Sequence, residues 1–545
     1  MTARDKHGFQ DRREAVHGGC RHDRRFACPV RALLMAGCGL LAACTVGPDY
    51  VRPHAPVPAR WPTAALQASG ASAPAAPSAG STAAAPGELI PPLSPVTSGA
   101  TDLKLWWDRF HDAQLSSLIA RALRANLDLR VAMVRTQEAL SQRDISRLAL
   151  WPTLSANASY DLEEISEATP EGSLLTAVPK FSLPGVGRIN IPNPYNQYQL
   201  GASASWELDL FGRLRRSIEA ANAQAQVSLE DQRAVQVSLI SQVAQNYIAL
   251  RGAQARRAVA LENLGTLTEL LQLTQQRHAA GLNTELDVRN ALAQLSQTRA
   301  TVPALDLAIT QSLHELANLL GAQPEALRAE LQRPEAIPPV PPRVPIGLPA
   351  ELVRRRPDIR EAEASLHAAT AQIGVAVADL FPQLTLSGAG GFQSDTLGSL
   401  LHWTSLFGSV GPALQLPVLD RGAWRTVSLY RLRAKEAALS YQATVLGALH
   451  QVEDAVAAYH ADQQQRQWLI DTVAQNRIAL QIARQRYGSG VTDFLNVLDA
   501  QRSLQQNELA LLASTTAVSI DLVSLYQALG GGWNSSPAAA SSPSP

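Results

Sequence analysis

Few residue patterns in this 545-residue sequence could do chemistry. His314-Glu315 begins like the zinc-protease helix motif, but Asn318 stands where the second histidine ligand is needed. Residues 388–393 half resemble a dinucleotide-binding loop without its last glycine, and residues 530–532 lack the Lys-Ser/Thr of a phosphate loop. The sequence therefore predicts no metal site, no cofactor and no catalytic group, and hence a protein that is not an enzyme.

One cysteine has a context that predicts covalent chemistry. Cys44 ends the run Leu41-Ala-Ala-Cys, which resembles a bacterial lipobox, and a short apolar stretch at residues 32–43 follows several arginines. This pattern predicts a signal peptide over residues 1–43 and a lipid on Cys44, with an ordinary signal peptide as the alternative. Thr45, where an aspartate would favour inner-membrane retention, predicts sorting to the outer membrane.

The composition limits the class of partner. Lys+Arg and Asp+Glu balance at 47 each, so charge gives no reason to expect a nucleic-acid partner. All four cysteines lie at or before Cys44, which excludes a disulfide framework in the body of the protein. The low aromatic content of 5% suits long helices packed by small side chains.

Long helices dominate the expected fold. Residues 214–271 read as one helix, roughly 87 Å long at 1.5 Å per residue, and residues 115–150 read as another. Near the carboxyl end, aliphatic residues recur every seven positions, the period of a helix that packs along a coiled-coil seam. These seam residues are Val497, Leu504, Leu511, Val518 and Leu525.

The seam occurs twice in the chain. Counting back 209 positions gives Val288, Leu295, Val302, Ile309 and Leu316, which are again all aliphatic. Gly321 and Gly530, which follow the two seams, also differ by 209. The spacing predicts an internal two-fold duplication of a long helical hairpin. The expected hairpin tips contain Gly281 in the first copy, and Gly488 and Gly490 in the second, because a reversal between helices needs backbone freedom.

Four segments change to a period of two, which is typical of β-strands. Two of them follow Trp151-Pro152 and Phe381-Pro382, and the others precede Arg213 and Arg421. No run of 18 apolar residues follows the signal, so we expect transmembrane strands and no membrane helix. Four strands cannot close a barrel, so sister chains must complete it, two copies giving eight strands and three giving twelve. A soluble four-stranded sandwich is the alternative.

Several motifs support a resemblance to one family. They are Trp106-Trp107 with Phe110-His-Asp112, the run from Leu352 to Arg360, Ile373-Gly-Val375, Tyr487-Gly-Ser-Gly490, residues 498–502, and the closing run from Ala528 to Trp533. In this order, from about Cys44 to Trp533, the chain resembles the outer membrane factor (TolC-like) family, most closely its lipidated NodT-type efflux members.

The resemblance implies a mainly α fold with a small β part. It implies a homotrimer in which a twelve-stranded barrel, four strands per chain, is continued by a long helical coiled-coil barrel in the periplasm. Such a trimer would be the passive exit duct of a tripartite pump for drugs or other small molecules. Its partners would be outer-membrane lipid, a periplasmic adaptor protein and an inner-membrane transporter of the RND type.

The resemblance also implies where such a duct closes. Arg486, Leu495 and Asp499 match the positions that hold the periplasmic aperture, with Asp499 lining the ring and Leu495 plugging it. The corresponding first-half residues are Arg277, Leu286 and Asn290, with Asp287 nearby. Because Asn290 does not repeat the charge of Asp499, the first tip need not act like the second.

These expectations divide the chain as follows. Residues 1–43 form the signal, 44–100 the lipid-anchored terminus and flexible linker, 101–332 the first efflux repeat, 333–349 a Pro-rich linker, 350–533 the second repeat, and 534–545 a disordered tail. A rival hypothesis is a lipid-anchored periplasmic coiled-coil protein that spaces the envelope layers. The strands discriminate between the two, because a spacer needs no barrel.

Overall fold

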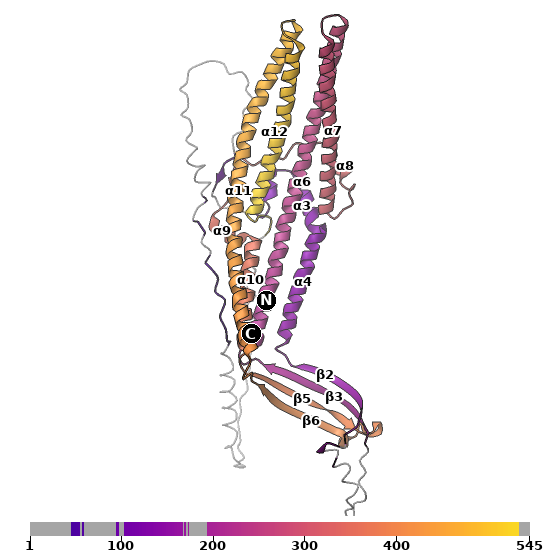
Figure 1. Cartoon of the computed structure of the whole chain (residues 1–545), viewed down its shortest axis with the longest axis vertical. Coiled ribbons are helices and arrows are strands. Elements are labelled where there is room, and N and C mark those ends of the chain that lie inside the picture. The colour runs from indigo at the N-terminus through magenta and orange to yellow at the C-terminus, as the bar shows by residue number, and fades with distance from the viewer. Residues whose placement is uncertain are drawn as a thin grey trace, which may run out of the picture.

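The computed structural model describes residues 45–54, 57–58, 61, 94–97, 103–166, 168–170, 173 and 193–533. The predicted signal, Cys44 and the predicted tail lie outside these residues. The described chain is mainly helical and elongated, with two helical hairpins pointing to one end and a four-stranded sheet at the other (Figure 1). This arrangement separates the hairpin tips from the sheet by the length of the longest helices.

The two longest helices carry the hairpins. α6 (Arg213–Ala279) has 67 residues and α11 (Arg421–Gly488) has 68, so each is about 100 Å long at 1.5 Å per residue. α7 (Glu285–Leu319) folds back along α6, and α12 (Phe494–Ala528) folds back along α11. The prediction of one unbroken helix over residues 214–271 is confirmed, and α6 continues to the tip.

The helix predicted over residues 115–150 is wrong as a single element. The structure has α3 (Ala113–Ala125) and α4 (Leu127–Leu148) instead. Asn126 breaks them apart because its backbone is extended and its side chain accepts a hydrogen bond from the Leu129 amide, which caps α4. Its Nδ2 also donates to the Leu319 carbonyl at 2.9 Å, which ties the break to the end of α7.

The second half enters its hairpin in a similar way. α9 (Pro349–Arg355) is followed by α10 (Pro357–Ala378), where proline begins the helix and therefore needs no amide hydrogen bond. α10 packs against both α6 and α11, whereas α4 packs against α6. Short elements complete the helical part, namely η1 (Trp106–Phe110) and α8 (Arg328–Leu331), together with the parallel pair β1 (Val96–Thr97) and β4 (Val344–Pro345).

The sheet contains β2 (Thr153–Glu163), β3 (Tyr195–Leu208), β5 (Gln383–Ser394) and β6 (Leu406–Gln415), with η3 (Leu397–Ser399) and η4 (Trp403–Ser405) between the last two. The strand order is β2-β3-β5-β6, and every pair is antiparallel. Within the described chain, β2 and β6 each have one neighbour. The sheet therefore has two open edges.

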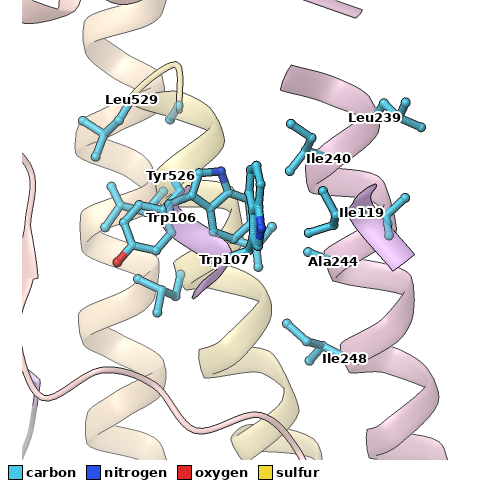
Figure 2. Packing of buried hydrophobic residues seen from close by; sticks show 14 of the residues in the cluster. Trp106, Trp107, Ile119, Leu239, Ile240, Ala244, Ile248, Tyr526 and Leu529 are labelled. Atoms are coloured by element: carbon cyan, nitrogen blue, oxygen red, sulfur yellow. The ribbon is translucent and has the colours of Figure 1, made fainter. Parts of the chain in front are cut away.

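A buried aromatic cluster holds the helices together midway along the molecule. Trp106 is fully buried and stacks on Tyr526 of α12, with ring centroids 5.1 Å apart. Ile240 and Ala244 of α6 belong to the same core, as Figure 2 shows. Burial of large aromatic side chains dominates core energetics, so the segment around η1 fixes how α6 and α12 lie against each other.

One helix among the described residues, α12, has the length and apolarity of a membrane span, although no continuous run of 18 apolar residues follows the signal. It meets these criteria by length and composition alone. It packs against α11 and α6, and its seam residues Val497, Val518 and Leu525 are buried. The apolarity of α12 is thus accounted for by helix packing.

Candidate functional site: the hairpin tips

Both hairpin tips reverse the chain with the same geometry. Gly281 and Gly490 adopt left-handed backbone conformations, with φ of 71° and 73°. After each glycine, an amide reaches back to close the helix: Leu282 N donates to the Arg277 carbonyl at 2.8 Å, and Val491 N donates to the Arg486 carbonyl at 2.9 Å. The predicted turn residue Gly488 differs, because it remains helical as the last residue of α11.

Arg277 connects the first tip to the second. Its guanidinium lies over the ring of Tyr487, 4.4 Å from the centroid, and Nη1 donates to the Tyr487 carbonyl at 3.2 Å. Asn283 Nδ2 donates to the Tyr487 hydroxyl at 2.5 Å. Tyr487 is buried and packs against Phe494 at the start of α12. One aromatic side chain of the second hairpin is therefore held by two polar residues of the first.

The other predicted aperture residues of the second tip are free of this cluster. Leu495 is 62% exposed, and Asp499, one helical turn later, is exposed as well. Arg486 is also exposed, and it forms no ion pair with Asp499 within this protomer. Leu495 and Asp499 lie four positions apart and so share a face of α12. The structure leaves this face available to a surface outside the described chain.

Asp287 has a structural contact of its own. It is the third residue of α7, and its Oδ2 accepts hydrogen bonds from the amide and the hydroxyl of Thr284, at 3.1 and 2.9 Å. The Asp287 amide donates in return to Thr284 Oγ1, which completes a capping box. The carboxylate is thus engaged in starting α7. Leu286, beside it, is 67% exposed, like its counterpart Leu495.

A buried polar layer lies several turns from the tips and also joins the two hairpins. Gln501 Nε2 donates to Asn263 Oδ1 at 3.2 Å, and Gln505 Nε2 donates to Thr298 Oγ1 at 3.0 Å. All four side chains are buried. Polar pairs inside an apolar seam fix its register, because a shift would leave buried groups unpaired. Sequence reasoning missed this layer, since it followed only the aliphatic seam positions.

A second polar feature lies between α11 and α12. Burial and, to a smaller extent, the neighbouring carboxyl of Asp462 together raise the pKa of Asp521 from 3.8 to about 7. Asp521 Oδ2 has no hydrogen-bond partner within the described chain. Two carboxyls in one partly buried place cannot both ionise without cost, which is the physical cause of the raised pKa. No cluster of three or more metal-ligating side chains occurs among the described residues.

Comparison with known proteins identifies the family. The model of the outer membrane efflux protein family matches two stretches, residues 118–322 and 348–531. The chain belongs to the outer membrane efflux protein family. Each matched stretch contains one strand pair, one hairpin and helices that precede the strands, so the family model covers the sheet and both tips.

The relatives of this outer membrane efflux protein are outer membrane proteins. It is 34% identical to the outer membrane protein OprJ of Pseudomonas aeruginosa over 516 residues, which is 94% of this chain and 97% of OprJ. It is 32% identical to the toluene efflux pump outer membrane protein TtgI of Pseudomonas putida over 509 residues, covering 93% and 98% of the two chains.

The fold agrees with a solved channel. The structure of the outer-membrane channel OprN superposes with a TM-score of 0.76 at 35% identity, covering 90% of this chain and all of that one. The resemblance to outer membrane factors is therefore confirmed. The protein is an outer-membrane efflux channel component with a mainly helical body, as the sequence predicted. The individual aperture residues remain predictions.

Proposed function

We propose that three copies of this chain form the exit duct of a tripartite efflux pump, as a passive channel without a catalytic step. The observation that carries this proposal is the open sheet. Among the described residues, β2 and β6 each lack a neighbour on one side, and a membrane offers no water to satisfy their free backbone groups. Joining the β6 edge of one copy to the β2 edge of the next closes the wall.

Three copies supply twelve strands and two supply eight. Head-to-tail joining of unlike edges produces a closed ring when the rotation between copies completes a circle. The resemblance to outer membrane factors favours three. Exposed apolar residues on the sheet, including Leu154, Leu162 and Val410, suit a wall in contact with lipid. We infer that the chain arose by duplication, since the tip caps 209 residues apart share one geometry.

The periplasmic end of the duct is proposed to close at the second hairpin tips. In a trimer, three copies of Leu495 and Asp499 would approach one axis, and their exposed positions support this. Three converging carboxylates repel one another unless bound cations or neighbouring arginines compensate them, and we propose that such compensated charges hold the tips together. We expect Asp499→Ala, alone or with Arg486→Ala, to raise single-channel conductance in lipid bilayers. Wild-type conductance in both variants would contradict the aperture assignment and leave the trimer proposal standing.

The proposed lipid on Cys44 would sit beside the root of the sheet. The described chain begins at Thr45, which contacts Gly212 at the junction of β3 and α6. Val46 N donates to the Phe211 carbonyl at 3.1 Å, and Asp49 pairs with the buried Arg216 at 2.5 Å. These contacts support an anchor at the level where strands give way to helices. Cys44→Ala should abolish incorporation of labelled palmitate without altering the fold.

The remaining partners follow from the relatives. TtgI is named as the outer membrane protein of a toluene efflux pump, and we propose that this chain likewise works with a periplasmic adaptor and an RND-type inner-membrane transporter. Its cargo would be drugs or other small molecules. Deleting the gene and measuring drug and solvent susceptibility tests the assignment. A lipid-anchored spacer, the rival hypothesis, would show neither altered susceptibility nor heat-modifiable, protease-resistant trimers in detergent.

A further inference from the structure

α4 lacks a partner that its counterpart has. α10, which lies 230 positions after α4, packs against both α6 and α11. α4 packs against α6, and no second long helix covers it among the described residues. Its uncovered side exposes apolar residues, namely Leu127, Val134, Ile145 and Leu148. An apolar stripe along a surface helix indicates a packing partner.

α11 has an uncovered stripe of its own. Leu432, Leu439 and Leu446 recur every seven residues and are 65%, 57% and 51% exposed. Such a heptad repeat is typical of a helix that packs lengthwise against another helix. The uncovered stripes of α4 and α11 lie at the two ends of the row of helices, just as β2 and β6 lie at the two edges of the sheet.

In α6 the same three positions are buried. Counting back 209 residues from the α11 stripe gives Ala223, Glu230 and Val237. Glu230 pairs with Arg360 of α10 at 2.8 Å, so α10 covers this face. α6 and α11 both run unbroken to tips whose caps are 209 residues apart, so one offset holds along their whole length. The exposed stripe of α11 is the face that a helix like α10 would cover.

We propose that α4 of a neighbouring copy covers this face of α11, in the register in which α10 covers α6. The inference rests on the proposed oligomeric channel and adds the residues that meet between its subunits. A second copy of the chain is the partner that fits, because each protomer exposes both complementary faces. Each face extends over several helical turns, which requires a long helix to cover it. Adding 209 to α6 positions and subtracting 230 from α10 positions gives the expected contacts.

A close contact between α6 and α10 sets this register. A Cβ on Gly374 of α10 would lie 2.8 Å from Cδ and 3.0 Å from Nε of Arg216. The counterparts of Arg216 and Gly374 are Arg425 and Asp144, which carry opposite charges. An aspartate at the position of Gly374 would bring its carboxylate next to the arginine side chain of the facing helix. We therefore expect an ion pair between Arg425 of one protomer and Asp144 of the next.

Both charges are available for this contact. Arg425 is exposed and has no ion pair within the described chain, whereas Arg216 is buried and held by Asp49 and Glu219. Asp144 is 57% exposed at its side chain and pairs only with arginines of its own helix, at 2.9 and 3.8 Å. The same offsets place Leu432 beside Val134 of the neighbour, which adds an apolar contact two turns away.

Cysteine cross-linking in the full-length protein tests the register. Arg425→Cys and Asp144→Cys are combined in one chain, and membranes are oxidised and analysed without reductant. We expect covalent dimers and trimers whose cross-links are cleaved by a reductant. They should be at least tenfold more abundant than with the matched pair Arg425→Cys and Gln137→Cys. Gln137 lies on the same helix, about 10 Å from Asp144 at 1.5 Å per residue, beyond the reach of a disulfide.

Charge reversal supplies an independent measurement. Arg425→Asp and Asp144→Arg should each lower the temperature at which trimers dissociate in detergent, and the double variant should recover it. The register would be overturned, and the trimer retained, if trimers of native mass cross-linked equally through both cysteine pairs. The same holds if the double charge-reversal variant did not recover the dissociation temperature. A monomer of native mass in the membrane would instead overturn the proposed function.

Discussion

The contact between Arg277 and Tyr487 yields the most demanding prediction about the tips. Arg277 belongs to the first hairpin and Tyr487 to the second, so any movement of one hairpin away from the other breaks it. Removing the guanidinium loses a cation-π contact of about 0.5–1 kcal/mol and a hydrogen bond of about 1 kcal/mol. Arg277→Ala should thus favour separated tips by about 1–2 kcal/mol per protomer, or roughly five- to thirtyfold.

The assay is single-channel recording in planar bilayers, which reads the open fraction of purified trimers directly. Tyr487→Phe should give a smaller increase, because it removes the Asn283 hydrogen bond and leaves the stacked guanidinium. Arg289→Ala is the matched control, since Arg289 is a tip arginine that pairs with Glu285 in its own helix at 2.7 Å. An equal change in Arg277→Ala and Arg289→Ala would refute the reasoning, because loss of charge alone would then explain the effect.

Three further predictions concern stability. The pKa of Asp521 is raised from 3.8 to about 7, so ionising this carboxyl destabilises the folded state. The free energy of unfolding should therefore be greatest below pH 4 and fall as the pH rises to about 7. Asp521→Asn should reduce the difference in unfolding free energy between pH 5 and pH 8, measured by denaturant titration, by on the order of 1–2 kcal/mol. An unchanged difference would count against the raised pKa. Gly252→Ala places a Cβ 2.3 Å from Thr516 Oγ1 and should lower the melting temperature, whereas Gly265→Ala, with open space around it, should be neutral or raise it. Asp287→Ala removes the capping box of α7 and should lower the free energy of unfolding by about 1 kcal/mol without changing the conductance. A large rise in conductance would instead show that Asp287 contributes to the aperture.

Much of the fold could be predicted because the periodicity of apolar residues indicates the long helices and the strands. The seven-residue recurrence through Leu504 and Leu525 predicts a long packed helix, and the offset of 209 residues locates both tips. Gly281 and Gly490 take the left-handed conformations that a reversal between helices requires. The break at Asn126 was missed, although Asn is a strong cap residue, because apolar residues continue on both sides of it.

The sequence by itself determined which aliphatic residues face a partner, and the tertiary structure decided which partner each one meets. Periodicity marks an apolar face but carries no information about the element that covers it. Tyr487 and Arg277 are 210 residues apart, and only the relative position of two hairpins brings them together. The same holds for the buried layer around Gln505, whose polar side chains give no aliphatic signal, and for Asp287, which the structure assigns to a helix cap because Thr284 lies within hydrogen-bonding distance.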